Sequence, residues 1–141
     1  MFIYGITPRQ LVELIEEIGL PYDLGTLPTN HLHIRAALDE QTEFNIQFHP
    51  GVPASEEGLD TPAPMVQFAT PFEAIGPATL SRLNTWNAQT LFGKAYIDGT
   101  GLVSIEHCFM IKGCAPPYVR GMIEIWDDVL SQFASHLYSG S

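Results

Sequence analysis

The chain has 141 residues, with 6 Lys and Arg against 16 Asp and Glu, so its formal net charge is −10 at pH 7. This length fits one domain, which we place at residues 1–138, with a flexible tail at residues 139–141. A hydrophobic content of 45% excludes wholesale disorder. Six basic residues spread along the chain argue against a nucleic-acid partner, because phosphate binding needs clustered Lys and Arg.

The compartment is predicted from the N-terminus and the cysteines. No basic segment precedes the apolar residues at the start, which is unlike a signal peptide, and no apolar run is long enough to span a membrane. We therefore expect a cytoplasmic protein without a membrane partner. In that reducing compartment Cys108 and Cys114 are expected to be free thiols.

The first predicted helix runs from Thr7 to Ile18. Thr7 is a good N-cap, Gln10 three residues later completes a capping box, and Pro8 suits the first helical position. Gly19 supplies the left-handed residue that ends the helix. The apolar positions follow the helical period: Leu11, Leu14, Ile15 and Ile18.

Two stretches of alternating apolar and polar residues follow, at 32–38 and 44–48. This alternation predicts an antiparallel hairpin with one buried face and one polar face. Residues 49–64 contain four prolines and no periodicity, so we expect a mobile Pro-rich loop there. A further strand is predicted at 65–70.

The second half of the chain predicts two helices and a hairpin. A helix opens at Pro77 and closes at Gly93, strands at 94–97 and 102–109 follow, and a long helix starts near residue 116. Gly121 inside this last helix indicates close packing there. The apolar stripe of the earlier helix is expected to comprise Leu80, Leu83, Asn87 and Leu91. The predicted order is α-β-β-β-α-β-β-α, an α/β fold of the α+β type in which helices pack on an antiparallel sheet.

Histidines are the first candidates for a functional site. His31 and His33 share one strand face, and His49 ends the neighbouring strand, so three imidazoles could hold zinc if a carboxylate joined them. The favoured interpretation is an exposed polar sheet face. We therefore expect neither a metal nor another cofactor.

Catalytic arrangements are not evident. His107 and Cys108 are adjacent on a strand, and adjacent strand residues point to opposite faces, so they cannot form a thiol–imidazole pair. The glycines that flank Thr100 form a hairpin turn capped by Asp98, and this turn offers no helix N-terminus to a phosphate. We expect no catalytic residues and no enzymatic activity.

The most unusual segment is Leu83-Asn84-Thr85-Trp86-Asn87. Asn is a mediocre helix former, and Asn87 falls on the expected apolar stripe, so its amide needs hydrogen-bond partners. Backbone groups at a neighbouring strand end are the expected partners, which makes Asn87 an amide clamp between helix and sheet. A ligand site, with Asn84 and Trp86 beside the same spot, is the less favoured alternative.

This segment also carries a family resemblance. Asn84, Trp86 and Asn87, followed by the Phe92–Asp98 run, resemble the YbjN family, and the resemblance extends over about residues 7–133. Its remaining carriers are Gly101, Glu106, Gly113 and Gly19-Leu20-Pro21-Tyr22. The resemblance implies a fold like that of type III secretion chaperones, and bacterial members described as sensory transduction regulators without established catalytic residues. The family-motif residues, with a structural or interaction role, would be Asn84, Trp86, Asn87, Lys94, Tyr96 and Asp98.

This sequence departs from the family pattern in two places. Ala115-Pro116-Pro117 replaces the usual Ser-type cap of the last helix, and residues 49–64 look like an insertion that could bring a partner of its own. The expected function is a non-enzymatic, chaperone-like or regulatory interaction module, a homodimer, that binds a protein or peptide partner. The alternative is a small-molecule or metal-binding domain that uses the His31, His33 and His49 face or the Asn84–Asn87 corner.

Overall fold

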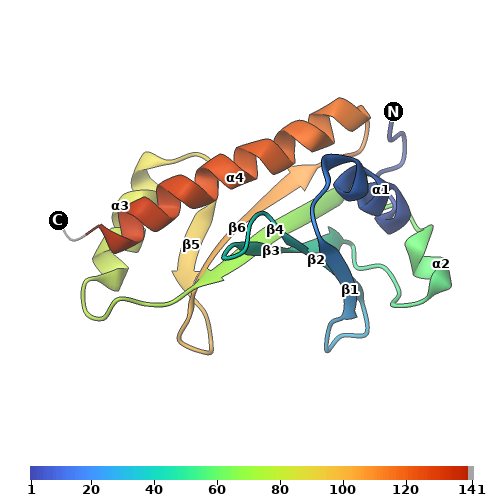
Figure 1. The fold of residues 1–141 in the computed structure, drawn as a ribbon. Coiled ribbons are helices and arrows are strands. Elements are labelled where there is room, and N and C mark those ends of the chain that lie inside the picture. The colour runs from blue at the N-terminus through green and yellow to red at the C-terminus, as the bar shows by residue number, and fades with distance from the viewer. Residues whose placement is uncertain (140–141) are drawn as a thin grey trace.

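A computed structural model describes residues 1–139. One antiparallel sheet with strand order β1-β2-β3-β4-β6-β5 forms its centre. The strands are β1 (Tyr22–Thr26), β2 (Leu32–Ala37), β3 (Glu43–His49), β4 (Met65–Phe72), β5 (Lys94–Ile97) and β6 (Val103–Met110). The helices are α1 (Pro8–Ile18), α2 (Glu56–Leu59), α3 (Thr79–Gln89) and α4 (Pro116–Tyr138). Figure 1 shows α1 and α4 on one side of the sheet and α3 beside β5.

The predicted α+β class and the predicted order of elements are confirmed, and the structure adds β1 and the short α2 to them. Of the predicted tail, residues 140 and 141 lie outside the described residues. Within residues 1–139 no helix combines the length and the apolar content that a membrane span needs.

The core lies between the sheet and α4. Phe68 of β4 is at its centre, with its ring centroid 5.1 Å from that of Phe44, 5.1 Å from that of Phe109 and 6.0 Å from that of Trp126. Fully burying a side chain of this size contributes about 2 kcal/mol. The predicted period of α4 is confirmed by its buried residues: Val119, Met122, Ile123, Trp126, Val129, Leu130, Phe133 and Leu137.

The start and end of α1 are those the sequence predicts. The Thr7 side chain accepts the Gln10 N–H, and the Gln10 side chain accepts the Thr7 N–H, which completes the capping box. Gly19 follows the helix with a left-handed φ of 89°. Both termini depend on contacts within a few residues, which is why the sequence reveals them.

The predicted boundaries of α3 are wrong, and its predicted apolar stripe is correct for Leu83 and Asn87 but not for Leu80 and Leu91. The helix ends at Gln89, because Thr90 is extended and its hydroxyl donates to the Trp86 carbonyl. Leu83 and Trp86 are buried, whereas Leu80 is 64% exposed and Leu91 is 91% exposed.

Two glycines play roles other than those predicted. Gly93 lies beyond the end of α3, has a φ of 83°, and a Cβ there would lie 2.9 Å from a methyl group of Ile105. Gly93 therefore permits a close approach to β6 and is not the cap of the helix. The close packing expected at Gly121 is also wrong, because nothing lies within 4 Å of the position of a Cβ there.

Residues 49–64 have more structure than the predicted loop. They contain α2, whose N-cap is Ser55 with a side chain that accepts the Gly58 N–H. Two isolated bridges join Pro53 to His31 and Ala63 to Ile6. Val52 and Ala63 are buried in the core. These contacts join residues far apart in the sequence, so periodicity does not reveal them. The mobility of this segment stays a prediction.

Candidate functional site

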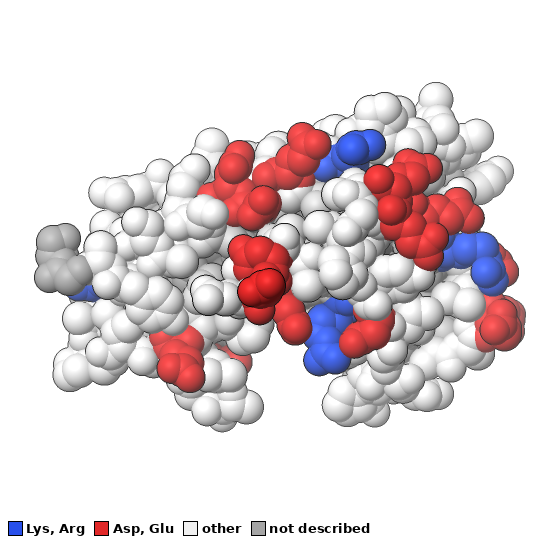
Figure 2. Space-filling model, viewed as in Figure 1, with Lys and Arg blue, Asp and Glu red and all other residues white. Residues whose placement is uncertain are grey.

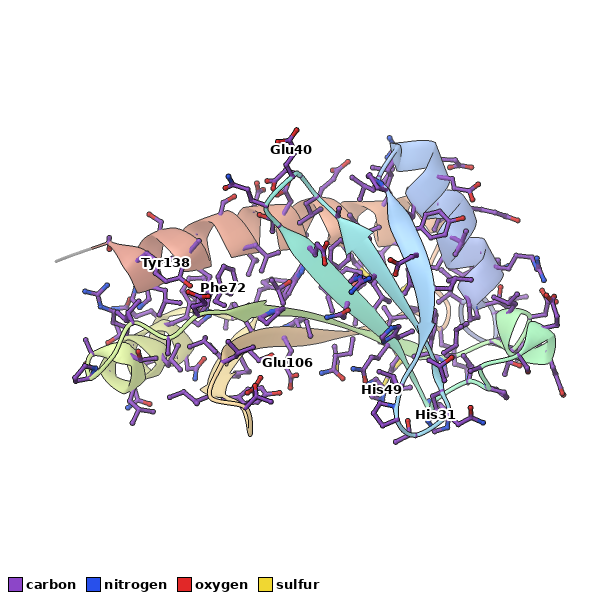
Figure 3. The ribbon with its side chains drawn as sticks, turned by 60° about the horizontal axis from the view of Figure 1, so that its bottom comes forward. His31, Glu40, His49, Phe72, Glu106 and Tyr138 are labelled. Atoms are coloured by element: carbon purple, nitrogen blue, oxygen red, sulfur yellow. The ribbon has the colours of Figure 1, made fainter. Side chains whose placement is uncertain are left out.

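The sheet face opposite α1 and α4 is uncovered and polar, as the alternation predicts (Figure 3). One row of this face crosses all of the strands: Asp23, Arg35, Asn45, Ala69, Glu106 and Lys94. In this row the Arg35 guanidinium lies 2.9 Å from the Asp23 carboxylate, and it lies 3.8 Å from that of Glu43. The face therefore presents charged and amide groups to its surroundings.

Hydrogen bonds connect polar side chains across four strands of this face. Tyr96 donates to Glu106 Oε2 at 3.1 Å, and Gln67 donates to the same oxygen at 2.7 Å. Because an ionised carboxylate only accepts, the Gln67 nitrogen must face Glu106, and its Oε1 is left for His49 at 2.7 Å. His49 Nε2 therefore carries a proton, and this nitrogen is a donor to Gln67 and not a free metal ligand.

The three histidines have separate partners. His31 Nδ1 lies 2.9 Å from the Thr29 hydroxyl, while the His33 ring lies over Gly25, where a Cβ would come within 2.3 Å of Nε2. No three His, Cys, Asp or Glu side chains of the described chain gather as metal ligands. The structure therefore does not bring His31, His33 and His49 together as a zinc site.

The amide clamp predicted at Asn87 is present. The Asn87 side chain donates to the Ala95 carbonyl and accepts the Ala95 N–H, both at 2.9 Å. The neighbouring Trp86 indole donates to the Gly93 carbonyl at 3.0 Å. The Asp98 N–H donates to the Leu102 carbonyl, and hydrogen-bonded residues alternate along an antiparallel strand, so the even-numbered residues of β5 bond to β6. The N–H and C=O of Ala95 therefore point away from β6. Two adjacent α3 side chains therefore occupy the outer edge of β5, where another strand would otherwise pair.

Asn84 is exposed and Trp86 is buried, which disagrees with the less favoured alternative, a ligand site with both residues beside one spot. Residues two positions apart on an α-helix point to nearly opposite sides. Lys94 is exposed and stands opposite Glu106 in the register. Asp98 caps the β5–β6 turn: its Oδ1 accepts from the Thr100 hydroxyl at 2.6 Å and from the Thr100 N–H at 2.8 Å. These hydrogen bonds hold the pKa of Asp98 below its ordinary value.

His107 and Cys108 face opposite sides of β6, as predicted. His107 Nδ1 accepts the Gly93 N–H at 3.1 Å, and its ring packs against Phe92 and Phe109. Burial lowers the pKa of His107. Cys108 is exposed on the open face, where partial desolvation and then the Glu106 charge raise the pKa of its thiol. A raised thiol pKa leaves little reactive thiolate at neutral pH.

The sequence did not reveal the outer edge of β1, which we call the β1 edge. The Ala37 N–H donates to the Pro21 carbonyl, and the Leu27 N–H donates to the His31 carbonyl. Because hydrogen-bonded residues alternate along an antiparallel strand, the backbone groups of the odd-numbered residues of β1 point toward β2. The N–H and C=O groups of Tyr22, Leu24 and Thr26 therefore point away from the sheet. In the structure of residues 1–139 no hydrogen bond reaches them.

A shallow hollow of about 260 Å³ lies beside the β1 edge. Its lining comprises Leu24, Gly25, Thr26, Leu32, Ala54, Ser55, Glu56 and Leu59. β1 has only five residues, and two of them, Asp23 and Gly25, are types that strands disfavour, which is why the sequence carries no clear signal for this strand.

The chain is therefore an α+β domain with an accessible strand. Helices lie on one face of its antiparallel sheet, side chains occupy one edge, and the other edge is open. The family model YbjN, "Putative bacterial sensory transduction regulator", matches residues 39–139, and the chain belongs to this family. The match includes the six family-motif residues and begins after β2, so α1, β1 and β2 lie outside it. Among curated proteins no match to the chain is found.

Proposed function

We propose that this member of the YbjN family is a regulatory module that binds an extended segment of a partner protein along the β1 edge and does not act by catalysis. The contrast between the two sheet edges carries this proposal. Asn87 and Trp86 occupy the backbone groups of Ala95 and Gly93 at the β5 edge. The β1 edge offers three outward N–H and C=O pairs, which is the pattern that strand addition uses.

The surroundings of the β1 edge indicate the chemistry of the partner. Leu24 is 44% exposed and lines the hollow together with Leu59, so an apolar side chain of an added strand would fit there. Glu56 also lines the hollow, and Glu16 accepts a hydrogen bond from Tyr22 beside the other end of β1. Carboxylates near both ends favour an extended segment with Lys or Arg around an apolar residue.

A phage-displayed library of random linear peptides, selected on the purified protein, tests the proposal. We expect selected peptides to be basic and to slow hydrogen exchange at Tyr22, Leu24 and Thr26. Leu24→Pro removes one outward N–H and leaves the β1–β2 hydrogen bonds intact, so it should weaken binding by about tenfold or more. The matched control is Ile97→Pro, which removes an outward N–H at the other edge and should leave binding unchanged. Selected peptides that protect another surface, or that bind Leu24→Pro normally, would contradict the proposal.

The proposal has two further parts. We propose a cytoplasmic location, which suits the free thiols of Cys108 and Cys114. We also propose that the module is a homodimer, so that one assembly presents two β1 edges to its partner.

A further inference from the structure

Two of the four methionines of the chain lie opposite each other on the uncovered face of the sheet. Met65 of β4 pairs with Met110 of β6, and Met65 also pairs with His49 of β3. Each methionine is four residues from a member of the row that crosses Ala69 and Glu106, so strand alternation places both on that face. His49 lies at the end of β3 on the same face (Figure 3). We call His49, Met65 and Met110 the His–Met row.

The hydrogen-bond pattern brings the two thioether side chains close together. The Ile111 N–H donates to the Pro64 carbonyl, which makes these two residues a hydrogen-bonded pair. Such pairs alternate along an antiparallel ladder, so the adjacent pair, Met65 and Met110, has no hydrogen bond between its members. In pairs of this kind the Cα atoms are only about 4.5 Å apart, and the side chains are closer than in hydrogen-bonded pairs. Two flexible thioethers at this spacing can direct both sulfur atoms to one ion.

The His49 ring is held in the tautomer that a metal ligand needs. Its Nε2 carries the proton that the Gln67 side chain accepts at 2.7 Å. In a neutral imidazole a proton on one nitrogen leaves a lone pair on the other, so Nδ1 of His49 is the donor atom. Gln67 is itself fixed by its hydrogen bond to Glu106. Histidine ligands of metal ions characteristically donate their second ring N–H to such an outer partner, which fixes the ring orientation.

The donor atoms indicate which metal ion the row would bind. Thioether sulfur is a soft ligand that favours Cu(I), and imidazole also binds copper. Zn²⁺ is bound by thiolate, imidazole and carboxylate groups, so a pair of thioethers disfavours it. All three donors are neutral, and the net charge of −10 favours the approach of a cation. In Figure 2 acidic side chains outnumber basic ones over α1 and α4.

We propose that Nδ1 of His49 and the sulfur atoms of Met65 and Met110 bind one Cu(I) ion. This site differs from the zinc site considered for three histidines, because its other ligands come from β4 and β6. Cys108 stands opposite Gln67 in the register, beside the row, and is not a ligand of the proposed site. The row lies away from the β1 edge, so the two proposals are independent.

NMR spectroscopy of the full chain with Ag(I), a redox-stable analogue of Cu(I), tests the ligand set. One equivalent of Ag(I) should shift the methyl signals of Met65 and Met110 and the Nδ1 signal of His49. The methyl signals of the other two methionines should stay in place, because Met122 is buried in α4 and Met1 is outside the row. The proton on Nε2 of His49 should remain. Unshifted Met65 and Met110 signals, or binding at Nε2, would overturn the proposal.

The two thiols must be distinguished from the row, because a thiol also attracts Cu(I). A double variant, Cys108→Ser with Cys114→Ser, should still bind one Cu(I) ion per chain when it competes with the chelator ferrozine under anaerobic, reducing conditions. Zn²⁺ added in place of Cu(I) should leave the methionine methyl signals of this variant unshifted. A double variant that no longer binds Cu(I) would assign the ion to the thiols and overturn the proposal.

Met110→Leu in this thiol-free chain tests the thioether directly. The substitution preserves side-chain volume at a 56% exposed position and removes the sulfur atom. The dissociation constant for Cu(I) should rise by about a hundredfold, at least as much as the loss of an outer partner of a ligand causes. The matched control is Met122→Leu, the same change in α4, which should leave the affinity unchanged. Far-UV circular dichroism checks that both variants are folded. Equal affinities of the Met110→Leu variant and its parent would overturn the proposal.

Discussion

Asn87→Ala is the most direct test of how α3 is fixed to the sheet. The substitution removes both 2.9 Å hydrogen bonds to Ala95 and leaves the N–H and C=O of an edge strand without their partner. A typical hydrogen bond contributes about 1 kcal/mol net, so the two bonds together contribute about 2 kcal/mol. Ala is a better helix former than Asn by about 0.6 kcal/mol, which offsets part of this loss. The free energy of unfolding should therefore fall by about 1.5 kcal/mol.

Urea unfolding followed by tryptophan fluorescence measures this change, with an unchanged slope as evidence that the unfolded state is unaffected. Asn87→Asp keeps the acceptor for the Ala95 N–H but places a carboxylate oxygen against the Ala95 carbonyl, so it should destabilise the protein at least as much as Asn87→Ala. Gln89→Ala, at an exposed amide of the same helix, supplies the control and should be neutral or slightly stabilising. An Asn87→Ala variant within about 0.5 kcal/mol of wild type would refute the clamp as an energetic contact.

Two further predictions concern a helix interior and a buried ring. Gly121→Ala should raise the free energy of unfolding by about 1 kcal/mol, because the position is helical and a Cβ there meets nothing within 4 Å. Thermal unfolding measures this change. A destabilised variant would show that the added methyl group is not accommodated. Burial lowers the pKa of His107, and its Nδ1 accepts the Gly93 N–H, so the folded protein holds the ring neutral. The unfolded chain takes up a proton near pH 6.5, so stability should fall as the pH drops below about 6.5 toward the lowered folded pKa. His107→Asn keeps an acceptor for the Gly93 N–H but has no titrating group. Urea unfolding at several pH values should show that this variant loses less stability at acidic pH than the wild type does. An equal loss of stability would assign the pH dependence to other groups.

The elements that the sequence predicts well depend on local contacts or on a strong period. Thr7 and Gln10 complete a capping box across three residues, Gly19 ends α1, and the apolar period of α4 extends over its whole length. The alternation in β2, β3 and β6 likewise separates the buried face from the polar face. For these elements the residue pattern and the final environment agree, because one helix stripe or one strand face is buried.

The sequence alone misassigns the boundaries of α3 and two members of its apolar stripe, and the reason is physical. Leu80 and Leu91 carry the apolar signal that normally indicates a buried stripe, but both are exposed, and Trp86 is buried in their place. Hydrophobicity identifies apolar residues but does not state whether the core or another molecule covers them. The amide of Asn87 could be predicted to need partners, because a polar group on a helix that packs against a sheet must form hydrogen bonds.

The residue pattern predicts an acidic α+β domain with a one-sided antiparallel sheet, the ends of α1, the buried residues of α4 and the need of the Asn87 amide for backbone partners. The folded chain is needed to see that this amide and the Trp86 indole occupy the β5 edge, that Tyr22–Thr26 is a strand with an open edge, and that His31, His33 and His49 have separate partners. The reason is that capping, period and alternation are properties of neighbouring residues. Which strand ends up at an edge, and what lies against it, depends on contacts between segments far apart in the chain.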